Sequence, residues 1–422
     1  MTKFEELNLI EPILKALKDK EYSIPTPIQA KAIPLILSNN DVLGCAQTGT
    51  GKTAAFAIPI IQNVHNVLEK QPGRARIQAL IVTPTRELAI QIDENIREYS
   101  KYTDIQHTVI FGGVKQNPQA NKLRAGVHIL VATPGRLLDL ISQNIIKLDS
   151  VKYFVLDEAD RMLDMGFIHD IKRLLAILPV RRQSLFFSAT MPANILELSK
   201  TILKNPKRIE VAPVSSTAET IKQYLYYTNK SNKGDLLLHI LKNKEIDQVL
   251  LFSRTKHGAD RIMKNLKKED ISALAIHGDK SQSQRQKALG QFKEGKIRVL
   301  VATDIAARGI DIDKLKYVIN FDIPNESESY VHRIGRSGRA GGEGTAISLC
   351  EPEENDFVRD IEKLINLKIE VIKENPYPQT EKPMNSAQRK NFEKEKNQKK
   401  QDFFAARKKQ ERGGNTFSRN RR

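Results

Sequence analysis

The sequence has few of the features that mark secreted or membrane-bound proteins. Its 422 residues include two cysteines, Cys45 and Cys350, which lie in separate apolar runs. This pattern argues against a disulfide framework and favours a reducing compartment. No apolar run approaches the roughly 18 residues that span a bilayer. The opening stretch MTKFEELNL also lacks the basic and apolar regions of a signal peptide. We therefore expect a soluble cytoplasmic protein with no membrane partner.

Positive charge is abundant and unevenly distributed. The net charge of +18 comes from 68 Lys and Arg against 50 Asp and Glu. Residues 371–422 alone contain 15 Lys and Arg and 6 Asp and Glu, which is half of the excess in an eighth of the chain. Charge alone is compatible with a polyanionic partner and with a merely solvated tail. The Lys-, Gln-, Asn- and Arg-rich composition predicts that this tail is disordered.

The two halves of the chain repeat each other. QALIVTPTR at 78–86 resembles QVLLFSRTK at 248–256, and HILVATPGR at 128–136 resembles RVLVATDIA at 298–306. VKYFVLD and LKYVINFD form a third pair. Each is a Val-, Ile- and Leu-rich run that ends in a polar turn, as in strands buried on both faces of a parallel sheet. Helical patterns separate the runs, so we predict two α/β domains, each a doubly wound parallel sheet.

Composition also places the domain boundaries. EVAPVSSTAET is a polar connector containing Pro and Ser, and NPYPQTEKPMNS interrupts helical periodicity. We predict domain 1 at 1–208, a linker at 209–220, domain 2 at 221–370 and the basic tail at 371–422.

One motif in the first half predicts a phosphate-binding loop. AQTGTGKT follows the apolar run DVLGC and precedes a helical stretch. Gly49 and Gly51 let backbone N–H groups face phosphate oxygens, Lys52 reaches the β and γ phosphates, and Thr53 offers a hydroxyl to Mg²⁺. Ala46 stands where the general pattern has its first glycine. The predicted nucleotide-contacting residues here are Ala46, Gln47, Thr48, Gly49, Thr50, Gly51, Lys52 and Thr53.

A carboxylate pair is expected beside this loop. YFVLDEAD ends an apolar run with Asp157, which can hold Mg²⁺, and Glu158, which can orient or deprotonate an attacking water. The second half of the chain has neither GKT nor a comparable acidic cluster. We therefore predict one nucleotide site, which binds ATP and Mg²⁺ on domain 1.

The second half supplies arginines instead. HRIGRSGR contains Arg336 and Arg339. By itself this stretch is compatible with a solvated basic loop. Opposite a phosphate loop, the two side chains would act as arginine fingers that stabilise charge during phosphoryl transfer, and only when the two domains close.

Taken in order, these motifs resemble those of the DEAD-box RNA helicases of superfamily 2, over about residues 4–350. The resemblance includes a Q motif within residues 4–29, AQTGTGKT, PTRELA, TPGR, VLDEAD, SAT, LLFSRT, QSQR, ATDIAARGID and HRIGRSGR. It implies two tandem RecA-like domains. The short core with a basic tail is most similar to the bacterial RhlE type. Glu21 departs from the family pattern, which usually has glycine before the aromatic residue of the Q motif.

The resemblance implies further site residues. The adenine and ribose would contact Phe4, Tyr22, Gln29 and Asp311. Coupling of the ATP site to closure would use Asp160, Ser188 and Thr190. The RNA backbone would contact Pro84, Thr85, Arg86, Gly112, Gly113, Thr133, Arg136, Gly278, Arg285 and Thr303.

We therefore expect an ATP-dependent RNA helicase. RNA-stimulated ATP hydrolysis would be coupled to domain closure, with local unwinding of short duplexes or remodelling of ribonucleoproteins. RNA contacts would be sequence-independent, because the candidate groups suit phosphate and sugar oxygens. The basic tail would bind structured RNA. Three alternatives stay open: an ATP-gated RNA clamp or scaffold with little turnover, a DNA-directed motor, and a dimeric scaffold with incidental ATPase activity. The sequence does not indicate the oligomeric state.

Overall fold

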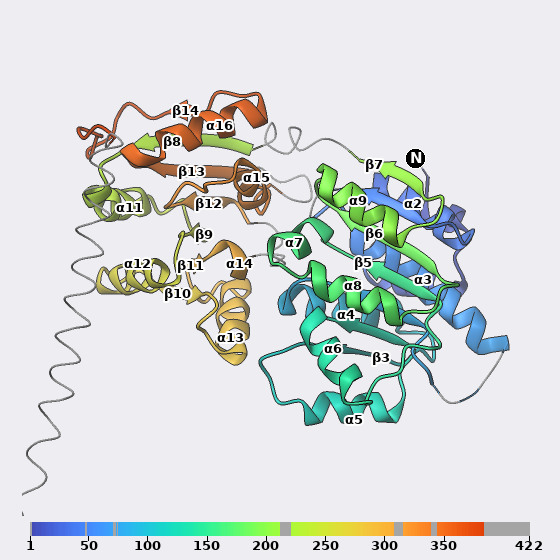
Figure 1. Ribbon diagram of the computed structural model, residues 1–422. Helices are drawn as coiled ribbons and strands as arrows, with labels where there is room; N and C mark the ends of the chain where they lie inside the picture. Colours follow the sequence, from blue (N-terminus) through green and yellow to red (C-terminus); the bar gives the residue numbers. More distant parts are fainter. Residues whose placement is uncertain are drawn as a thin grey trace, which may run out of the picture.

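A computed structural model of the protein describes residues 2–46, 49–70, 73, 75–211, 221–307, 315–338 and 344–383. Four predicted site residues, Gln47, Thr48, Asp311 and Arg339, lie outside these ranges. So do most of the predicted linker and residues 384–422, which include most of the predicted tail. Two α/β bodies are joined in tandem (Figure 1).

Domain 1 contains a seven-stranded parallel sheet of order β3-β4-β2-β5-β6-β1-β7. Its strands are β1 Val42–Cys45, β2 Ala79–Val82, β3 His107–Ile110, β4 Ile129–Ala132, β5 Tyr153–Leu156, β6 Gln183–Ser188 and β7 Lys207–Glu210. Its helices are η1 Phe4–Leu7, α1 Glu11–Asp19, α2 Pro27–Leu37, α3 Lys52–Lys70, α4 Arg86–Tyr99, α5 Asn117–Ala125, α6 Pro134–Ser142, α7 Ala159–Asp164, α8 Ile168–Ile177 and α9 Ala193–Ile202.

Domain 2 contains a second seven-stranded parallel sheet, of order β10-β11-β9-β12-β13-β8-β14. Its strands are β8 Ile221–Tyr227, β9 Val249–Phe252, β10 Ala273–Ile276, β11 Val299–Ala302, β12 Tyr317–Asn320, β13 Gly344–Cys350 and β14 Glu370–Val371. Its helices are η2 Lys230–Asn232, α11 Lys233–Leu241, α12 Lys256–Lys268, α13 Gln282–Lys293, α14 Asp304–Ala307, α15 Ser327–Ile334, η4 Pro352–Glu354 and α16 Asn355–Ile365.

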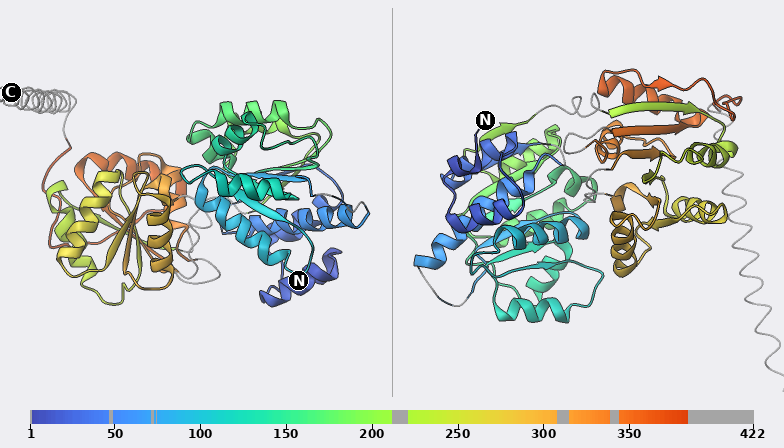
Figure 2. Two further views of the ribbon diagram at one scale, coloured as in Figure 1. Left: turned by 90° about the horizontal axis from the view of Figure 1, so that it is seen from below. Right: turned by 180° about the vertical axis from the view of Figure 1, so that it is seen from behind.

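The repeated segments occupy equivalent places in the two sheets. β4 and β11 are second in their sheets, β2 and β9 are third, and β5 and β12 are fourth. Helices cover both faces of each sheet (Figures 1 and 2). The predicted fold of two doubly wound parallel sheets is confirmed. The internal repeat therefore reflects a repeated domain.

Residues within one strand pack into two different cores, as a sheet covered on both faces requires. In β2, Ala79 and Ile81 belong to the core that contains α3, whereas Leu80 and Val82 belong to the core that contains α6. The strands of both sheets run parallel, so the carboxyl ends of each sheet share one edge. In such sheets, loops at that edge form the binding site.

Three further observations bear on the sequence predictions. Cys45 and Cys350 are both free thiols. Residues that follow the predicted end of domain 2 at 370 still contact β8: the backbone N–H groups of Ile372 and Gln379 donate to Leu225 and Tyr227. In the part of the chain that the structure covers, no helix is both long and apolar enough to cross a membrane.

Candidate active site

The predicted phosphate loop leaves the end of β1 and leads into α3. Gly49 and Gly51 have φ of 87° and 92°, in the left-handed region that favours glycine. A Cβ at Gly51 would lie 2.4 Å from Nε2 of Gln29, so a larger residue does not fit. Lys52 is buried, and its Nζ donates to the carbonyl of Ala46 at 2.7 Å. The backbone at the start of the loop therefore holds the Lys52 ammonium.

Gln29 ties the start of α2 to this loop. Its Oε1 accepts from the backbone N–H of Thr26 at 2.9 Å, within a capping box. Its Nε2 donates to the carbonyl of Gly51 at 3.1 Å. Both polar atoms of the Gln29 amide thus have protein partners. Contact with an adenine would require Nε2 to exchange or share its bond to Gly51.

The two predicted adenine-side aromatics lie in different environments. Phe4 is buried in the core of domain 1, with 3% of its surface exposed. Tyr22 is 40% exposed, and its ring centroid lies 6.4 Å from that of Tyr99. Tyr22 is therefore accessible for stacking, whereas Phe4 supports the segment from inside.

Asp157 follows β5 and is buried beside the phosphate loop. Its carboxylate accepts from the backbone N–H of Glu158 at 2.9 Å. Burial raises the pKa of the Asp157 carboxyl, Lys52 opposes this rise, and Glu158 adds to it. A cation bound here would hold the carboxylate ionised. Thr53 lies in the first turn of α3, after Lys52.

Glu158 adopts an unusual backbone conformation and has a partner that the sequence analysis missed. Its φ of 53° and ψ of 51° are left-handed. Both carboxylate oxygens accept from Nη1 of Arg161 at 2.8 Å, and both side chains are almost completely buried. Nη2 of Arg161 is buried without a hydrogen-bond partner in the structure. The only sequence signal was an arginine three residues after the glutamate.

Asp160 joins α7 to the segment that follows β6. One of its oxygens accepts from the backbone N–H groups of Ala189 and Thr190 at 3.1 and 3.0 Å, and from the Thr190 hydroxyl at 3.2 Å. Oγ of Ser188 accepts from the N–H of Asp160 at 3.2 Å. Burial opposes ionisation, but the positive charges of Arg161 and Lys52 outweigh it and lower the pKa of Asp160. The three predicted coupling residues therefore form one hydrogen-bonded unit.

Domain 2 meets this unit through α15 and the turn after it. Arg336 is buried, at 3% exposure. It lines a cavity of about 20 Å³ at the domain interface, large enough for one water molecule. Arg161 is the member of this lining that belongs to domain 1. The remaining lining residues are Phe252, Asp304, Ser329, His332 and Arg333.

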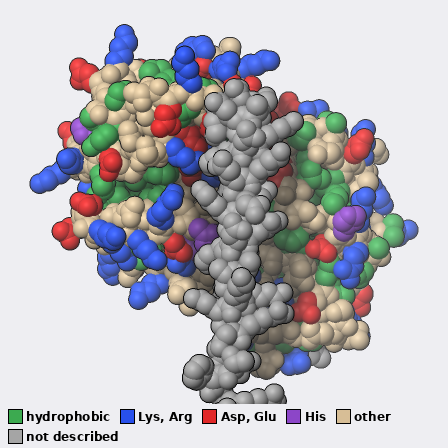
Figure 3. Space-filling view, turned by 60° about the vertical axis from the view of Figure 1, so that its left-hand side comes forward, with side chains coloured by type: hydrophobic (Ala, Val, Ile, Leu, Met, Phe, Trp, Pro, Cys, Tyr) green, Lys and Arg blue, Asp and Glu red, His purple; other side chains and the backbone are tan. Residues whose placement is uncertain are grey.

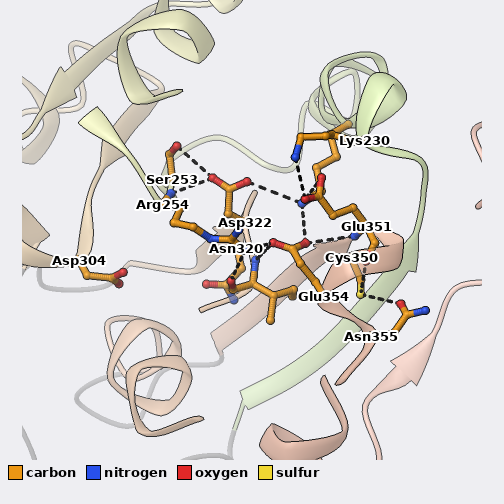
Figure 4. A network of polar contacts seen from close by, with 12 residues as sticks. Lys230, Ser253, Arg254, Asp304, Asn320, Asp322, Cys350, Glu351, Glu354 and Asn355 are labelled. Carbon is orange, nitrogen blue, oxygen red and sulfur yellow. Dashed lines mark hydrogen bonds and ion pairs between the residues drawn. The ribbon is translucent and has the colours of Figure 1, made fainter. Parts of the chain in front are cut away.

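Hydrogen bonds within domain 2 hold Arg333 in place beside this cavity. Arg333 donates from Nε and Nη2 to Asp304 at 2.6 and 2.7 Å, and from Nη1 to the carbonyl of Asp322 at 2.6 Å. Figure 4 shows Asp322 within a larger polar network, and Asp304 apart from it. At its centre, fully buried Glu354 accepts from Lys233 at 2.7 Å and from Arg254. Arg333 is thus a structural member of HRIGRSGR, and it orients the helix that leads to Arg336.

A cleft between the domains brings together most of the predicted RNA-binding residues. Its volume is about 500 Å³. Eight of the ten predicted residues line it: Pro84, Thr85, Arg86, Gly112, Thr133, Arg136, Gly278 and Arg285. Gly113 lies behind the cleft, where a Cβ would come within 2.1 Å of Nη1 of Arg86 at a φ of 77°. Thr303 is not among the lining residues.

Glu87 connects the domains across this cleft and was not predicted. Its carboxylate lies 3.0 Å from Nη2 of Arg285 and accepts from Nε2 of Gln282 at 3.2 Å. Both partners belong to α13 in domain 2. An acidic residue inside PTRELA was the available signal, but nothing in the sequence paired it with QSQR.

The sequence of this chain matches those of known protein families. Residues 26–198 match the family model described as DEAD/DEAH box helicase, and residues 232–341 match the helicase conserved C-terminal domain. The DEAD-box ATP-dependent RNA helicase CshA of Geobacillus kaustophilus is 43% identical over 373 residues, which are 88% of this chain and 79% of the relative. The chain belongs to the DEAD-box helicase family.

Solved structures of this family superpose on the chain to different degrees. S. cerevisiae Dbp5 bound to RNA and ADP BeF3 matches with a TM-score of 0.79 at 32% identity, covering 88% of this chain and 96% of Dbp5. A DEAD box protein from Methanococcus jannaschii matches with a TM-score of 0.52 at 42% identity, covering 88% of this chain and 99% of that protein. The more identical of the two proteins superposes less well.

Proposed function

We propose that this DEAD-box helicase hydrolyses ATP in an RNA-dependent reaction and uses the cycle to clamp and locally separate RNA strands. The observation that carries the proposal is the meeting of two half-sites. The phosphate loop and carboxylates belong to domain 1, the buried Arg336 belongs to domain 2, and one cleft with basic and glycine residues crosses both.

Each half-site has a chemical role. Lys52 and the loop amides bind the β and γ phosphates of ATP. Glu158 accepts a proton from the attacking water. The oxygen of that water bonds to the γ-phosphorus while the bond between the γ-phosphorus and ADP breaks. Arg336, with Arg339, stabilises the charge that builds on the transferred group. Tyr22 and Gln29 face the adenine, with Phe4 behind them, and Asp311 contacts the ribose.

The site also fits Mg²⁺. No cluster of three or more His, Cys, Asp or Glu that could hold a metal exists among the described residues. Mg²⁺ usually binds through one or two protein oxygens together with substrate phosphates. Asp157, a buried carboxyl with a raised pKa, and Thr53 provide such oxygens. When bound, Mg²⁺ would neutralise phosphate charge and polarise the γ-phosphoryl group.

RNA binding and closure are linked by geometry. The higher TM-score with RNA- and nucleotide-bound Dbp5 supports a closed arrangement for this chain. Strand contacts would come from the predicted RNA-binding residues of both domains, so closure completes the RNA site and the ATP site together. Asp160, Ser188 and Thr190 would transmit the nucleotide state, because they join the carboxylate segment to β6.

Finer assignments belong to the same proposal. The predicted limits are 1–208 and 221–370 with a linker at 209–220. The pairing of β7 with β1 as far as Glu210, and the bond from Gln379 to β8, favour domain ends somewhat after 208 and 370. A cytoplasmic location and a basic tail that binds structured RNA are part of the same proposal. The RhlE subtype is not confirmed by the relative described above, which is named CshA.

The decisive test is steady-state ATP hydrolysis with Mg²⁺, with and without single-stranded RNA, using Glu158→Gln as the control. We expect strong RNA stimulation that the variant loses. Stimulation by DNA of the same sequence, but not by RNA, would instead support a DNA-directed motor. ATP-dependent retention of RNA without hydrolysis would support a clamp or scaffold.

A further inference from the structure

One face of α12 carries a line of basic side chains that the site above does not use. His257, Arg261, Lys264 and Lys268 recur at helical spacing and are all exposed. At 100° per residue they fall within one narrow arc. The opposite face of the helix buries Ala259, Ile262 and Leu266 in the core. We call the four exposed residues the α12 basic face.

Three cations of this face form no ion pair with the described residues. Within the described ranges, Arg261, Lys264 and Lys268 make no hydrogen bond or ion pair to another residue. Two nearby acids pair with other cations: Asp260 lies 2.8 Å from Lys280, and Asp279 lies 2.8 Å from Lys256. Asp235 and Glu269 line a groove with Arg261 and Lys268 but form no ion pair with them. A helical face whose cations lack acidic partners favours an external anion more than a face laced with ion pairs does.

The first turn of α12 contacts a loop that lines the RNA cleft. Lys256, the first residue of α12, pairs with Asp279, and the neighbouring Gly278 lines the cleft between the domains. From His257 to Lys268 the helix rises about 16 Å. An RNA strand that leaves the cleft over domain 2 therefore meets a series of cations along α12.

The face ends where the basic tail begins. Arg261 and Lys268 share a groove between α11 and α12 with Glu381, close to the end of the described chain at 383. The other acidic residues that line this groove are Asp235, Glu269, Asp322 and Glu351. α12 lies on the side of domain 2 remote from domain 1 (Figures 1 and 2). With that side turned forward, Figure 3 shows Lys and Arg side chains in several groups.

We propose that the α12 basic face is a second RNA-binding site, a track for the phosphate backbone of RNA that extends beyond the cleft toward the tail. This proposal rests on the proposed function, because it needs RNA in the cleft. Its contacts are sequence-independent, and they act by releasing counterions from the bound strand. RNA long enough to reach the α12 basic face therefore binds more tightly than RNA that fills only the cleft.

The test compares RNA lengths and salt concentrations. Binding of a short oligouridylate that fits the cleft and of a longer one is measured by fluorescence anisotropy over a range of KCl. The variant is the full chain with Arg261→Gln, Lys264→Gln and Lys268→Gln. A matched control, Lys242→Gln, Lys244→Gln and Lys363→Gln, removes the same charge from exposed positions elsewhere on domain 2.

For the longer RNA we expect the slope of log affinity against log salt to fall by about 2 in the variant, from three lost cations at roughly 0.7 each. The control should keep the wild-type slope. An unchanged slope in the variant, an equal loss at both RNA lengths, or an equal loss in the control would each overturn the track. Failure of the wild-type protein to bind either RNA would instead overturn the proposed function.

Discussion

Glu158 combines a left-handed backbone with a fully engaged side chain. Non-glycine residues in this region are strained, and such strain persists only where the surroundings enforce it. Here Nη1 of Arg161 holds both carboxylate oxygens, and Nη2 faces the domain interface without a partner. Because Arg161 also lines the cavity that Arg336 lines, domain 2 can influence Glu158 through this side chain.

We expect Arg161→Met to reduce kcat for RNA-stimulated ATP hydrolysis, because Glu158 loses its orienting partner. The loss of a charged hydrogen bond, about 2 kcal/mol, corresponds to roughly thirtyfold. The KM for ATP should change little, since Arg161 contacts the carboxylate and not the phosphate loop. Arg161→Lys should recover part of the rate.

The control for this prediction is Arg173→Ala. Arg173 is an exposed arginine that also pairs with an acid three residues away, Asp170. It should behave as wild type. Loss of ATP affinity in Arg161→Met with kcat unchanged would contradict the positioning role.

At the scale of elements, the end of α1 explains the departure at Glu21. The backbone N–H groups of Glu21 and Tyr22 donate to Lys18 and Leu17, which closes the helix with a left-handed residue. Glu21 is that residue, with φ of 58°. Glycine would adopt this conformation without strain, so the position favours glycine for the geometry of a helix end.

We expect Glu21→Gly to stabilise domain 1 by about 1 kcal/mol, because a left-handed conformation costs a non-glycine residue about that much. The measurement is the midpoint of thermal unfolding of the full chain. Lys20→Gly is the control, because Lys20 has φ of −92° and gains nothing from glycine. A lower midpoint for Glu21→Gly than for wild type would contradict this account.

Whole-molecule behaviour depends on charges that meet only across the domain interface. His332 of domain 2 lies near Asp160, Arg161 and Lys52 of domain 1 and near Arg336 of its own domain. Burial lowers the pKa of His332 to about 3, Arg161 contributes in the same direction, and Asp160 opposes it. The imidazole is therefore neutral in the closed arrangement at neutral pH.

This shift predicts that acid opens the molecule. A histidine that is freed from the interface regains a pKa near 6.5, so it binds a proton more tightly than the buried one. The contribution of buried, neutral His332 to the stability of the closed arrangement is fully present above pH 6.5. It is lost progressively as pH falls from 6.5 toward 3. Fluorescence energy transfer between labels on the two domains, with ATP and RNA present, should decrease from pH 7 to 5. His332→Gln should reduce this dependence, and an identical pH profile would contradict the assignment.

Much of this organisation follows from the sequence by itself. The repeated apolar runs determined the parallel strands, and the same three pairs occupy equivalent positions in the two sheets. AQTGTGKT and VLDEAD marked their strand ends, because phosphate loops and carboxylate turns consist of contiguous residues with strict backbone demands. Features made of contiguous residues can therefore be predicted from the sequence alone.

Only the tertiary structure decided which distant or backbone-dependent groups meet. Glu87 pairs with Arg285 because the two domains approach at one particular angle, and no local pattern specifies that angle. Arg161 reaches Glu158 because the backbone of Glu158 is left-handed, which a three-residue spacing does not reveal. The line of cations on α12 was visible as composition, but its place between cleft and tail depends on how the helix packs. Side-chain partners thus depend on packing between segments, and that is where inference from the sequence ends.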